Sequence, residues 1–460
     1  MTVIQKINSI RILLFIVAVL FIGGCKNDSP TEPEKTNREL LIQTWDLKQA
    51  LDIGTDPSHP ADVTKEINYA YLQFNEDGSY TSSIQNGKWE LDDINNQIIF
   101  DKNTSAQLTA DIIKLASDTL RFKMEIPFVN TPSLYQFTFT VDKNAGSRSP
   151  ELNFETLWKG FDENYSFFEI KNINWDSVYA VYRPQVNSST TDIQLFNIFK
   201  SMLSIFKDGH VNLFTPVGNY GYSGWYTDYP ANFLGASAIS KYLSKDYGKL
   251  ANNNIWYGKI GTDIGYIYIG PNFNGDYYDW SNSIDVVIDS LINTKGIIMD
   301  IRNNGGGSDN LAKAVASRFT DQTKIFSYVR WRNGPKHSDF TDYEALTISP
   351  LGRNTYSKPV VVLTNRHCFS SAEEFLLMME SLPQVSVIGD TTGGGSGNPL
   401  IRQLPNGWTY WVPHWIQYTA EKEIYEGIGL APYIHVSISD ADSTADKDTI
   451  LESALQYLSK

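Results

Sequence analysis

The stretch KPVVVLTNRHCFSSAEEFLLMMESL, Lys358–Leu382, decides the fold of the C-terminal half of the chain. A short β-branched run, a polar turn and an apolar run follow one another directly, which is typical of a buried strand that turns into a helix. We expect the helix to begin near Ser371. A serine at that point lies beside unpaired N–H groups and the positive end of the helix dipole, and these donors can hold an oxyanion.

The same alternation of strands and helices continues on both sides of this stretch, from Gly265 onward. GYIYIGPNF, KGIIMDIR and VSVIGD predict short strands, and the apolar residues within 284–291 and 311–319 predict helices between them. Alternation of this kind favours a largely parallel sheet that is packed by helices. Residues 257–460 are therefore predicted to form a mixed α/β core.

The segments before this core have a different character. Residues 151–214 carry aromatic and aliphatic side chains at helical spacing, and their second helix is expected to stop at KDGHVNLF, where Gly209 ends it. Residues 215–256 are rich in Gly and Tyr and lack a clear period. Residues 144–150, within NAGSRSPE, have the composition of a linker.

Residues 38–143 predict a small all-β domain. YAYLQFNEDGSYTSS, GKWELDD and YQFTFTVDK are short aromatic and β-branched runs, separated by turn signals such as Asp77-Gly78. Strands this close together suggest hairpins that close into a barrel. The order Trp, Phe-x-x-Asp-Gly-x-Tyr, Gly-x-Trp-x-Leu resembles the lipocalin-like domains of cell-surface lipoproteins. A ligand-binding cup and a spacer both remain open.

The first residues have the pattern of a processing signal. Lys6 and Arg11 precede an unbroken apolar run, Ile12 to Ile22, which is too short to span a bilayer but suits a signal peptide. The run ends in IGGC, which resembles the lipobox of bacterial lipoproteins, so residues 1–24 would be removed and Cys25 acylated. The alternative is an ordinary cleaved signal with an incidental cysteine. Residues 25–37 then form a flexible tether.

Composition excludes some classes of function. The chain of 460 residues has a formal net charge of −14 and contains no basic run, which argues against a nucleic-acid partner. Its only two cysteines are Cys25 and Cys368. If Cys25 carries lipid, neither an intrachain disulfide nor a cysteine-based metal site is expected. We expect no cofactor and no metal.

Three side chains near the expected helix start are candidate nucleophiles. Ser370 has the character of a helix N-cap, and Cys368, as a lone thiol in the turn, has that of a small buried hydrophobe. Ser371 is the remaining candidate. Of the six histidines, His210 is the best candidate base, because it sits in a tight Asp-Gly-His turn at a helix end, although a structural cap is also open.

Two glycine-rich segments complete the set of candidate functional segments. DIRNNGGG, Asp300 to Gly307, follows a strand and suggests a backbone that must be approached closely, while the lack of a following Gly-Lys-Ser/Thr excludes a P-loop. A backbone N–H aimed at a reacting oxygen would explain the run. YEGIGLAP, Tyr425 to Pro432, places Glu426 in a turn where it could orient a histidine or simply lie at the surface.

KDGHVNLF, GYIYI, DIRNNGGG, SSAEEF with GDTTGGG, and YEGIGLAP occur in an order and spacing that resemble peptidase family S41, from about Leu152 to the C-terminus. The C-terminal processing branch of that family uses a Ser–Lys dyad, but the first lysine after Ser371 is Lys422, too distant to match. The tricorn-like branch uses His, Ser and a late Glu, which His210, Ser371 and Glu426 match. Gly209 stands where that branch can have an assisting serine.

The resemblance implies a fold and a mechanism. It implies an α+β multidomain chain: a lipocalin-like barrel, a helical subdomain and a crotonase-like spiral β-β-α core. His210 would take the Ser371 proton, Glu426 would hold the imidazolium, and the N–H groups of Gly306 and Ala372 would bind the oxyanion. Glu374 is expected to be structural. Residues 215–256 are too short for a complete PDZ module, so they could line or cover the site instead.

These observations predict a lipid-anchored serine peptidase that acts on peptides or unfolded proteins. Its only membrane contact would be the lipid on Cys25, and its expected location is the cell envelope of a Gram-negative bacterium. Lys26, rather than Asp, after the cysteine favours the outer membrane, on its periplasmic or surface face. The first alternative is a catalytically inactive S41 fold that binds peptides, and a Cys368–His367 enzyme is a third reading.

Overall fold

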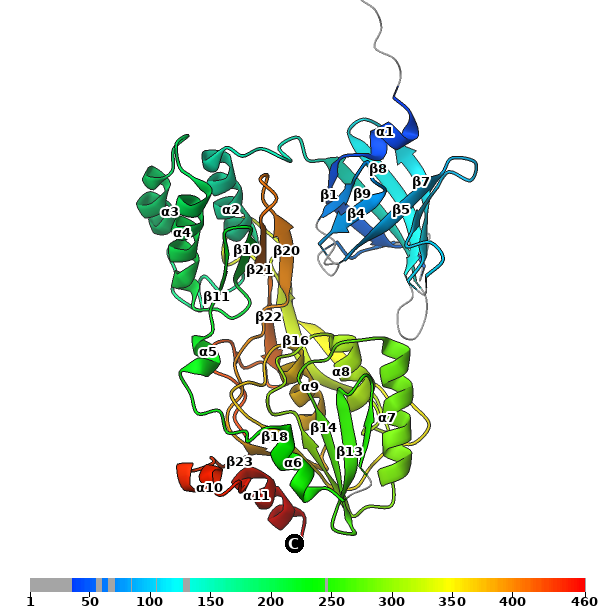
Figure 1. Cartoon of the computed structure of the whole chain (residues 1–460), viewed down its shortest axis with the longest axis vertical. Coiled ribbons are helices and arrows are strands. Elements are labelled where there is room, and N and C mark those ends of the chain that lie inside the picture. The colour runs from blue at the N-terminus through cyan, green and yellow to red at the C-terminus, as the bar shows by residue number, and fades with distance from the viewer. Residues whose placement is uncertain are drawn as a thin grey trace, which may run out of the picture.

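The computed structural model describes residues 35–54, 60–64, 71–83, 85–104, 106–126, 133–244 and 247–459. A barrel, a group of helices and a sheet-rich core follow one another along the chain (Figure 1). The predicted signal peptide, Cys25, residues 25–34 of the tether and His59 lie outside the described residues. Within the described part, no helix is long and apolar enough to cross a membrane.

The first domain is a closed antiparallel barrel that follows the short helix α1 (Asn37–Leu41). Eight strands pair in chain order, and β1 pairs with both β3 and β9, which closes the barrel; β2 pairs only with β1. The small all-β barrel predicted from the sequence is confirmed. The strands are β1 (Thr44–Asp52), β2 (Ala61–Asp62), β3 (Tyr71–Phe74), β4 (Ser79–Ser82), β5 (Asn86–Asp92), β6 (Gln97–Phe100), β7 (Leu108–Leu115), β8 (Thr119–Ile126) and β9 (Ser133–Val141).

Aromatic side chains fill the barrel, because alternate residues of each strand point inward. Phe122 and Phe139 stack with ring centroids 5.6 Å apart, and Phe74 meets Trp89 edge-on at 4.9 Å. The cavity that the described side chains leave inside measures about 20 Å³. That space suits about one water molecule and is far below the size of ordinary ligand pockets.

Three helices follow the barrel: α2 (Pro150–Asn164), α3 (Trp175–Tyr182) and α4 (Asp192–Leu203), with 3₁₀ turns η1 (Arg183–Gln185) and η2 (Ser204–Phe206). Ser149 caps α2 through the Leu152 N–H, and Thr191 forms a capping box with Gln194 at α4. Their aromatic faces share a core with strands from near residue 410, including Tyr410 and Val412. The helical segment is thus stabilised by strands more than 200 positions away.

Two small antiparallel sheets lie between these helices and the core (Figure 1). One has the order β11-β10-β21-β20 and the other β17-β16-β22. Residues 215–256, which lack a clear period, contain the end of β10, all of β11, two short helices, β12 and the start of β13. The elements are β10 (Asn212–Thr215), β11 (Gly218–Gly221), α5 (Gly224–Thr227), α6 (Ala236–Tyr242), β16 (Lys324–Trp331), β17 (Glu344–Ile348), β20 (Pro399–Gln403), β21 (Thr409–Pro413) and β22 (Trp415–Thr419).

The core is a sheet of order β12-β13-β14-β15-β18-β19-β23, parallel from β14 to β23. The largely parallel sheet predicted from the sequence is therefore present, with an antiparallel edge. Its elements are β12 (Gly248–Leu250), β13 (Ile255–Ile260), β14 (Ile264–Ile269), α7 (Tyr277–Leu291), β15 (Gly296–Asp300), α8 (Asp309–Ala316), β18 (Val360–Thr364), α9 (Ser371–Glu380), β19 (Val385–Gly389), β23 (Ile434–His435), α10 (Asp440–Thr444) and α11 (Thr449–Leu458).

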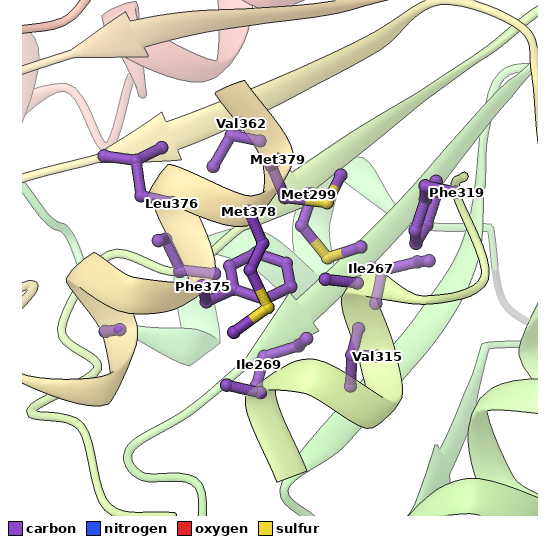
Figure 2. Packing of buried hydrophobic residues seen from close by; sticks show 14 of the residues in the cluster. Ile267, Ile269, Met299, Val315, Phe319, Val362, Phe375, Leu376, Met378 and Met379 are labelled. Atoms are coloured by element: carbon purple, nitrogen blue, oxygen red, sulfur yellow. The ribbon is translucent and has the colours of Figure 1, made fainter. Parts of the chain in front are cut away.

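Helices cover both faces of this sheet. Met299 and Val362 pack with α7, α8 and α9, whereas Ile298 and Val361 pack with α6 and α11. Figure 2 shows Phe375 and Met378 of α9 directed toward side chains of the sheet and of α8. Because α9 is held in this way along its whole length, the residue at its first turn is fixed in space.

Candidate active site

Ser371 is the first residue of α9 and follows β18 across a short turn, as the sequence predicts. Its side chain is 2% exposed, and its Oγ donates a hydrogen bond of 2.7 Å to the carbonyl oxygen of Gly307. Ser370 has a φ of +57°. A non-glycine residue in that region is strained, and such strain is concentrated at functional sites.

The glycine run after β15 lies directly against this helix start. Gly306 has a φ of +96°, and a Cβ built on it would stand 2.6 Å from the Phe369 carbonyl oxygen and 3.0 Å from the Ser371 nitrogen. This is the close approach of backbones that the run predicts. The Gly306 N–H donates to Asn304 Oδ1 (2.9 Å), and the Ala372 N–H donates to Phe369 O (3.1 Å). Both predicted oxyanion donors thus have internal partners in this state.

His210 stands in a tight turn between η2 and β10. Asp208 holds this turn, because its Oδ1 accepts the His210 backbone N–H at 2.8 Å and its Oδ2 accepts the Tyr165 hydroxyl at 2.8 Å. The His210 side chain is 6% exposed, and its Nδ1 has no hydrogen-bond partner in the described part of the chain. Burial lowers the pKa of His210 to about 4, with Asp208 opposing and Lys171 assisting the shift. The ring is therefore neutral at pH 7 and can accept a proton.

Position 209 shows why the assisting serine of the tricorn-like branch is missing. A Cβ on Gly209 would stand 2.6 Å from the Trp225 indole nitrogen and 2.8 Å from the Phe369 ring. These two rings stack with centroids 4.0 Å apart. The aromatic segment 215–256 therefore reaches the site through Trp225 and leaves room only for glycine before His210.

One cavity of about 500 Å³ brings Ser371, His210 and Gly306 together. It is lined by side chains or backbone from seven separate stretches of the chain. The lining residues include His210, Trp225, Gly305, Gly306, Gly307, Asp309, Phe369, Ser371, Glu374, Ser396, Trp411, Trp415 and Gln417. A depression of this size, with a serine, a neutral histidine and backbone N–H groups, is suited to acyl transfer on an extended chain.

Glu426 lies beside this cavity rather than in its lining. Its Oε1 is 3.0 Å from Lys171 Nζ, and its Oε2 accepts the Ser396 N–H at 2.9 Å and the Ser396 hydroxyl at 3.1 Å. Burial, assisted by Asp208 and opposed by Lys171, raises the pKa of Glu426 to about 7. Ser396 does line the Ser371 cavity, so its hydroxyl connects the cavity with the Glu426 carboxylate.

The two glutamates after Ser371 differ in function. Glu373 is completely buried, and its carboxylate accepts the Thr392 hydroxyl (2.5 Å) and the N–H groups of Gly394 (2.7 Å) and Gly395 (2.7 Å). It therefore ties the GDTTGGG segment to the first turn of α9. Glu374, which was expected to be structural, lines the cavity instead.

Asp309 and Glu374 form an acidic pair at the cavity. Burial raises the pKa of Asp309, which the Ser371 hydroxyl lowers in part. Burial and then Asp309 raise the pKa of Glu374 well above its usual value. The negative charge of Asp309 thus makes ionisation of Glu374 less favourable, because two close carboxylates in a buried site do not both ionise readily.

Cys368 and His367 are packed away from this chemistry. Cys368 is completely buried, its Sγ donates to the Ile301 carbonyl oxygen at 3.1 Å, and burial raises the pKa of the thiol. A thiol in that state is a poor nucleophile. The His367 ring packs edge-on against Tyr226 at 4.5 Å.

Sequence reasoning did not find Lys171, Asp208 or Ser396. Lys171 lies in FFEIKNINW, where nothing marks it as different from a surface lysine. Asp208 and Ser396 lie within the DGH and TTGGGSG segments, in which His210 and the glycines are the more evident candidates. The sequence signal for Asp208 is its place two positions before a histidine in a tight turn, because an Asp side chain commonly accepts the backbone N–H of the residue two positions later.

Comparison with known proteins agrees with this geometry. Residues 263–436 match the model of peptidase family S41, and residues 148–204 match that of the tricorn protease C1 domain. A "putative peptidase" from Parabacteroides merdae, known from its crystal structure, is 38% identical, with a TM-score of 0.63, covering 68% of this chain and 97% of that one.

Two curated relatives match over shorter stretches. The carboxy-terminal processing protease CtpA of Bacillus subtilis is 29% identical over 157 residues, which is 33% of this chain and 31% of the relative. A carboxy-terminal-processing protease of Bartonella bacilliformis is 29% identical over 182 residues, which is 39% of this chain and 40% of the relative. The chain therefore spans less than half the length of these curated relatives.

These matches define the class of the protein as a serine peptidase, within the hydrolases. The chain belongs to peptidase family S41.

Proposed function

We propose that this protein hydrolyses peptide bonds in peptides or unfolded proteins, with Ser371 as nucleophile, His210 as base and Glu426 as the acid that supports His210. The observation that carries the proposal is that the buried side chains of Ser371 and His210 line one cavity of about 500 Å³ beside the Gly305–Gly307 backbone. At pH 7 the imidazole of His210 is unprotonated, as a base must be, and the Asp208 carboxylate, which raises the pKa of His210 against the effect of burial, favours the protonated form during the reaction.

The proposed reaction follows the general course of acyl transfer by serine. His210 accepts the Ser371 hydroxyl proton while the Oγ attacks the carbonyl carbon of the scissile bond. The proton then passes from His210 to the leaving amine, and water repeats the cycle on the acyl-enzyme. The negatively charged Glu426 region stabilises the imidazolium that exists between the two proton transfers.

Three hydrogen bonds must be exchanged before attack. The Ser371 hydroxyl must leave the Gly307 carbonyl oxygen, and the Gly306 and Ala372 N–H groups must turn from Asn304 Oδ1 and Phe369 O toward the substrate oxygen. Catalytic hydrogen bonds often tighten only in the complex with substrate. We propose that an extended peptide in the cavity drives this exchange.

Hydrolysis of a casein digest, followed by mass spectrometry, tests the proposal. Wild type should release new termini, and Ser371→Ala and His210→Ala should lose this activity by at least about 10³-fold, the scale typical of triad members. Ser381→Ala at the other end of α9 is the matched control and should retain it. Equal cleavage by wild type and Ser371→Ala would refute the assignment.

A second candidate function is peptide binding without turnover. It is favoured by one observation, that Glu426 contacts Lys171 and Ser396 while the Nδ1 of His210 has no partner in the described part of the chain. A protein of this kind would retain peptides from the digest and release no new termini. Cleavage that disappears in His210→Ala would eliminate it.

We further propose that lipid on Cys25 anchors the protein to the cell envelope, on the outer membrane of a Gram-negative bacterium. The IGGC motif and the following Lys26 support this. Metabolic labelling with a radioactive fatty acid should mark wild type and not Cys25→Ser, and the wild type should sediment with the outer membrane. Unlabelled wild type would contradict the anchor.

For the barrel, we propose the role of a lipocalin-like spacer. The small internal cavity of about 20 Å³ supports a spacer over a ligand-binding cup. Residues of the barrel and of α2 together line a separate cleft of about 370 Å³ between the barrel and the peptidase part, and the lining includes the charged residues Asp46, Lys159 and Arg402. This polar cleft supports a barrel held beside the helices.

A further inference from the structure

Lys171, Asp208 and Glu426 form a buried charge cluster next to the Ser371 cavity. The Lys171 Nζ is 3.0 Å from Glu426 Oε1 and 3.9 Å from Asp208 Oδ2. The Lys171 side chain is 15% exposed, and those of Asp208 and Glu426 are 1% and 2% exposed. One cation thus lies between two carboxylates that are almost entirely removed from water.

The three residues come from separate parts of the fold. Lys171 follows α2, Asp208 forms the turn that carries His210, and Glu426 sits in a turn whose Gly427 N–H donates to Gly394 O at 2.7 Å. The Glu426 turn is therefore docked on the same segment that Glu373 ties to the start of α9. Lys171 connects the base-bearing turn to the nucleophile-bearing helix through Glu426.

The cluster also faces a cavity of its own. Lys171, Asp208 and Glu426 line a space of about 370 Å³ that shares Gly209, Trp225 and Phe369 with the Ser371 cavity. Lys171 is not in the lining of the Ser371 cavity. Lys171 therefore lies outside the Ser371 cavity. From there it can influence His210 through Asp208 and Glu426, but it does not contact a substrate in that cavity.

We propose that Lys171 is a positioning residue for the peptidase site, whose ammonium group holds the Asp208 turn and the Glu426 carboxylate together and thereby fixes His210. This inference rests on the proposed function and deepens it. The lysine required here is unrelated to a Ser–Lys dyad, because it contacts the acid and not the nucleophile.

The charges around the cluster are consistent with this role. Burial lowers the pKa of Lys171, but Asp208 and Glu426 outweigh it, so the pKa is raised and the ammonium stays charged. Burial raises the pKa of Tyr165 well above its usual value and that of Tyr220 to about 12, so both phenols stay neutral. Tyr222 and Arg366 also line the second cavity. The Arg366 guanidinium donates hydrogen bonds to the carbonyl oxygens of Trp225, Thr392 and Ile428.

Loss of Lys171 has a defined electrostatic consequence. Lys171 lowers the pKa of His210, and Asp208 raises it. Removing the cation leaves burial still lowering the pKa and Asp208 still raising it, but takes away one lowering influence, so the pKa of His210 moves upward from about 4. A residue that only filled space would not change this pKa.

Three variants test the proposal: Lys171→Met, Lys171→Arg and the control Lys159→Met, whose side chain on α2 is 68% exposed. The rate of Ser371 labelling by a fluorophosphonate at pH 7 should fall at least about tenfold in Lys171→Met, be restored largely by Lys171→Arg, and stay unchanged in Lys159→Met. Equal rates in Lys171→Met and wild type would overturn the proposal.

The His210 pKa, measured from imidazole NMR resonances that His210→Asn removes, decides the matter independently of activity. It should rise by about one unit in Lys171→Met and not in Lys159→Met. An unchanged pKa would overturn the inference. If Lys171→Met does not fold, Lys171→Met/Glu426→Gln removes both charges and should show the same rise. Wild type that is not labelled at Ser371 would refute the proposed function, while the His210 titration would still test Lys171.

Discussion

The Ser371 hydroxyl donates its hydrogen bond to the carbonyl oxygen of Gly307, 2.7 Å away. The proposed nucleophile is thus hydrogen-bonded to the glycine segment that is proposed to supply an oxyanion donor. In this arrangement the hydroxyl proton is held by a weakly basic carbonyl, so Ser371 is at rest. A substrate carbonyl that approaches the Gly306 N–H would displace the Ser371 hydroxyl from the Gly307 carbonyl oxygen. The hydroxyl could then turn toward His210.

Replacement of Gly306 by alanine should disable the site. The new Cβ would stand 2.6 Å from the Phe369 carbonyl oxygen at a φ of +96°, so strain and collision together should cost about 2–4 kcal/mol of unfolding free energy and abolish labelling of Ser371. Gly407→Ala is the matched control, because its φ is +88° but nothing lies within 4 Å of the new Cβ. It should cost about 1 kcal/mol and leave labelling intact. Equal effects in both would show that φ alone matters.

Replacement of Glu373 by glutamine should loosen the GDTTGGG segment. The carboxylate accepts the Thr392 hydroxyl and the Gly394 and Gly395 N–H groups, and a glutamine would turn an NH₂ group toward some of these donors. We expect a loss of about 2–4 kcal/mol in urea unfolding. Glu423→Gln, at an exposed position, should stay within about 0.5 kcal/mol of wild type. A loss of unfolding free energy as small as that of Glu423→Gln would show that Glu373 does not hold the GDTTGGG segment to α9.

Glu426→Gln should change how stability depends on pH. The folded-state pKa of Glu426 is raised to about 7 from the usual 4.5, so the folded protein retains this proton between those values and wild-type stability falls as pH rises from 4.5 to 7. Glutamine has no such titration. The stability of the variant relative to wild type should therefore increase from pH 5 to pH 8, by up to about 3 kcal/mol.

The measurement is urea unfolding at a series of pH values, with Glu423→Gln again as the control that should run parallel to wild type. A stability difference between Glu426→Gln and wild type that stays constant from pH 5 to pH 8 would mean that Glu426 titrates normally in the folded protein.

The barrel should be stable because it is filled. Phe137 is 1% exposed and lines the small internal cavity, so Phe137→Ala should cost about 3–5 kcal/mol of barrel stability. The same change should create a space that binds a hydrophobic fluorescent dye, whereas wild type should bind none. Ile94→Ala, at a 95% exposed position, should have no effect on either measurement. Tight dye binding by wild type would favour a ligand-binding cup.

The parts of the site that the sequence predicts are those set by local backbone geometry. Ser371 follows from a strand, a turn and a helix start in one stretch, and Gly306 from a glycine run whose backbone is crowded by a neighbour. His210 is predicted as the candidate base among six histidines because of its turn, and the small barrel is predicted from closely spaced hairpins. Each of these signals is local in the sequence.

The features that the sequence does not predict depend on contacts between distant segments. Lys171 meets Glu426 across more than 250 positions, and Trp225 reaches Gly209 from a segment without a clear period. Which of Glu373 and Glu374 binds the GDTTGGG segment and which lines the cavity depends on the direction in which the first turn of α9 faces, and the helical period alone does not determine that direction. Such contacts form only when distant segments pack together, so they can be identified only from the folded structure.

The central claim is that Ser371, rather than its neighbours, is the nucleophile. The most direct test is to react the protein with a fluorophosphonate at pH 7 and to locate the adduct by peptide mass spectrometry. The account predicts a single adduct on Ser371, which His210→Ala suppresses by at least about 10³-fold. An adduct on Ser370 or Cys368, or no adduct on wild type, would contradict it.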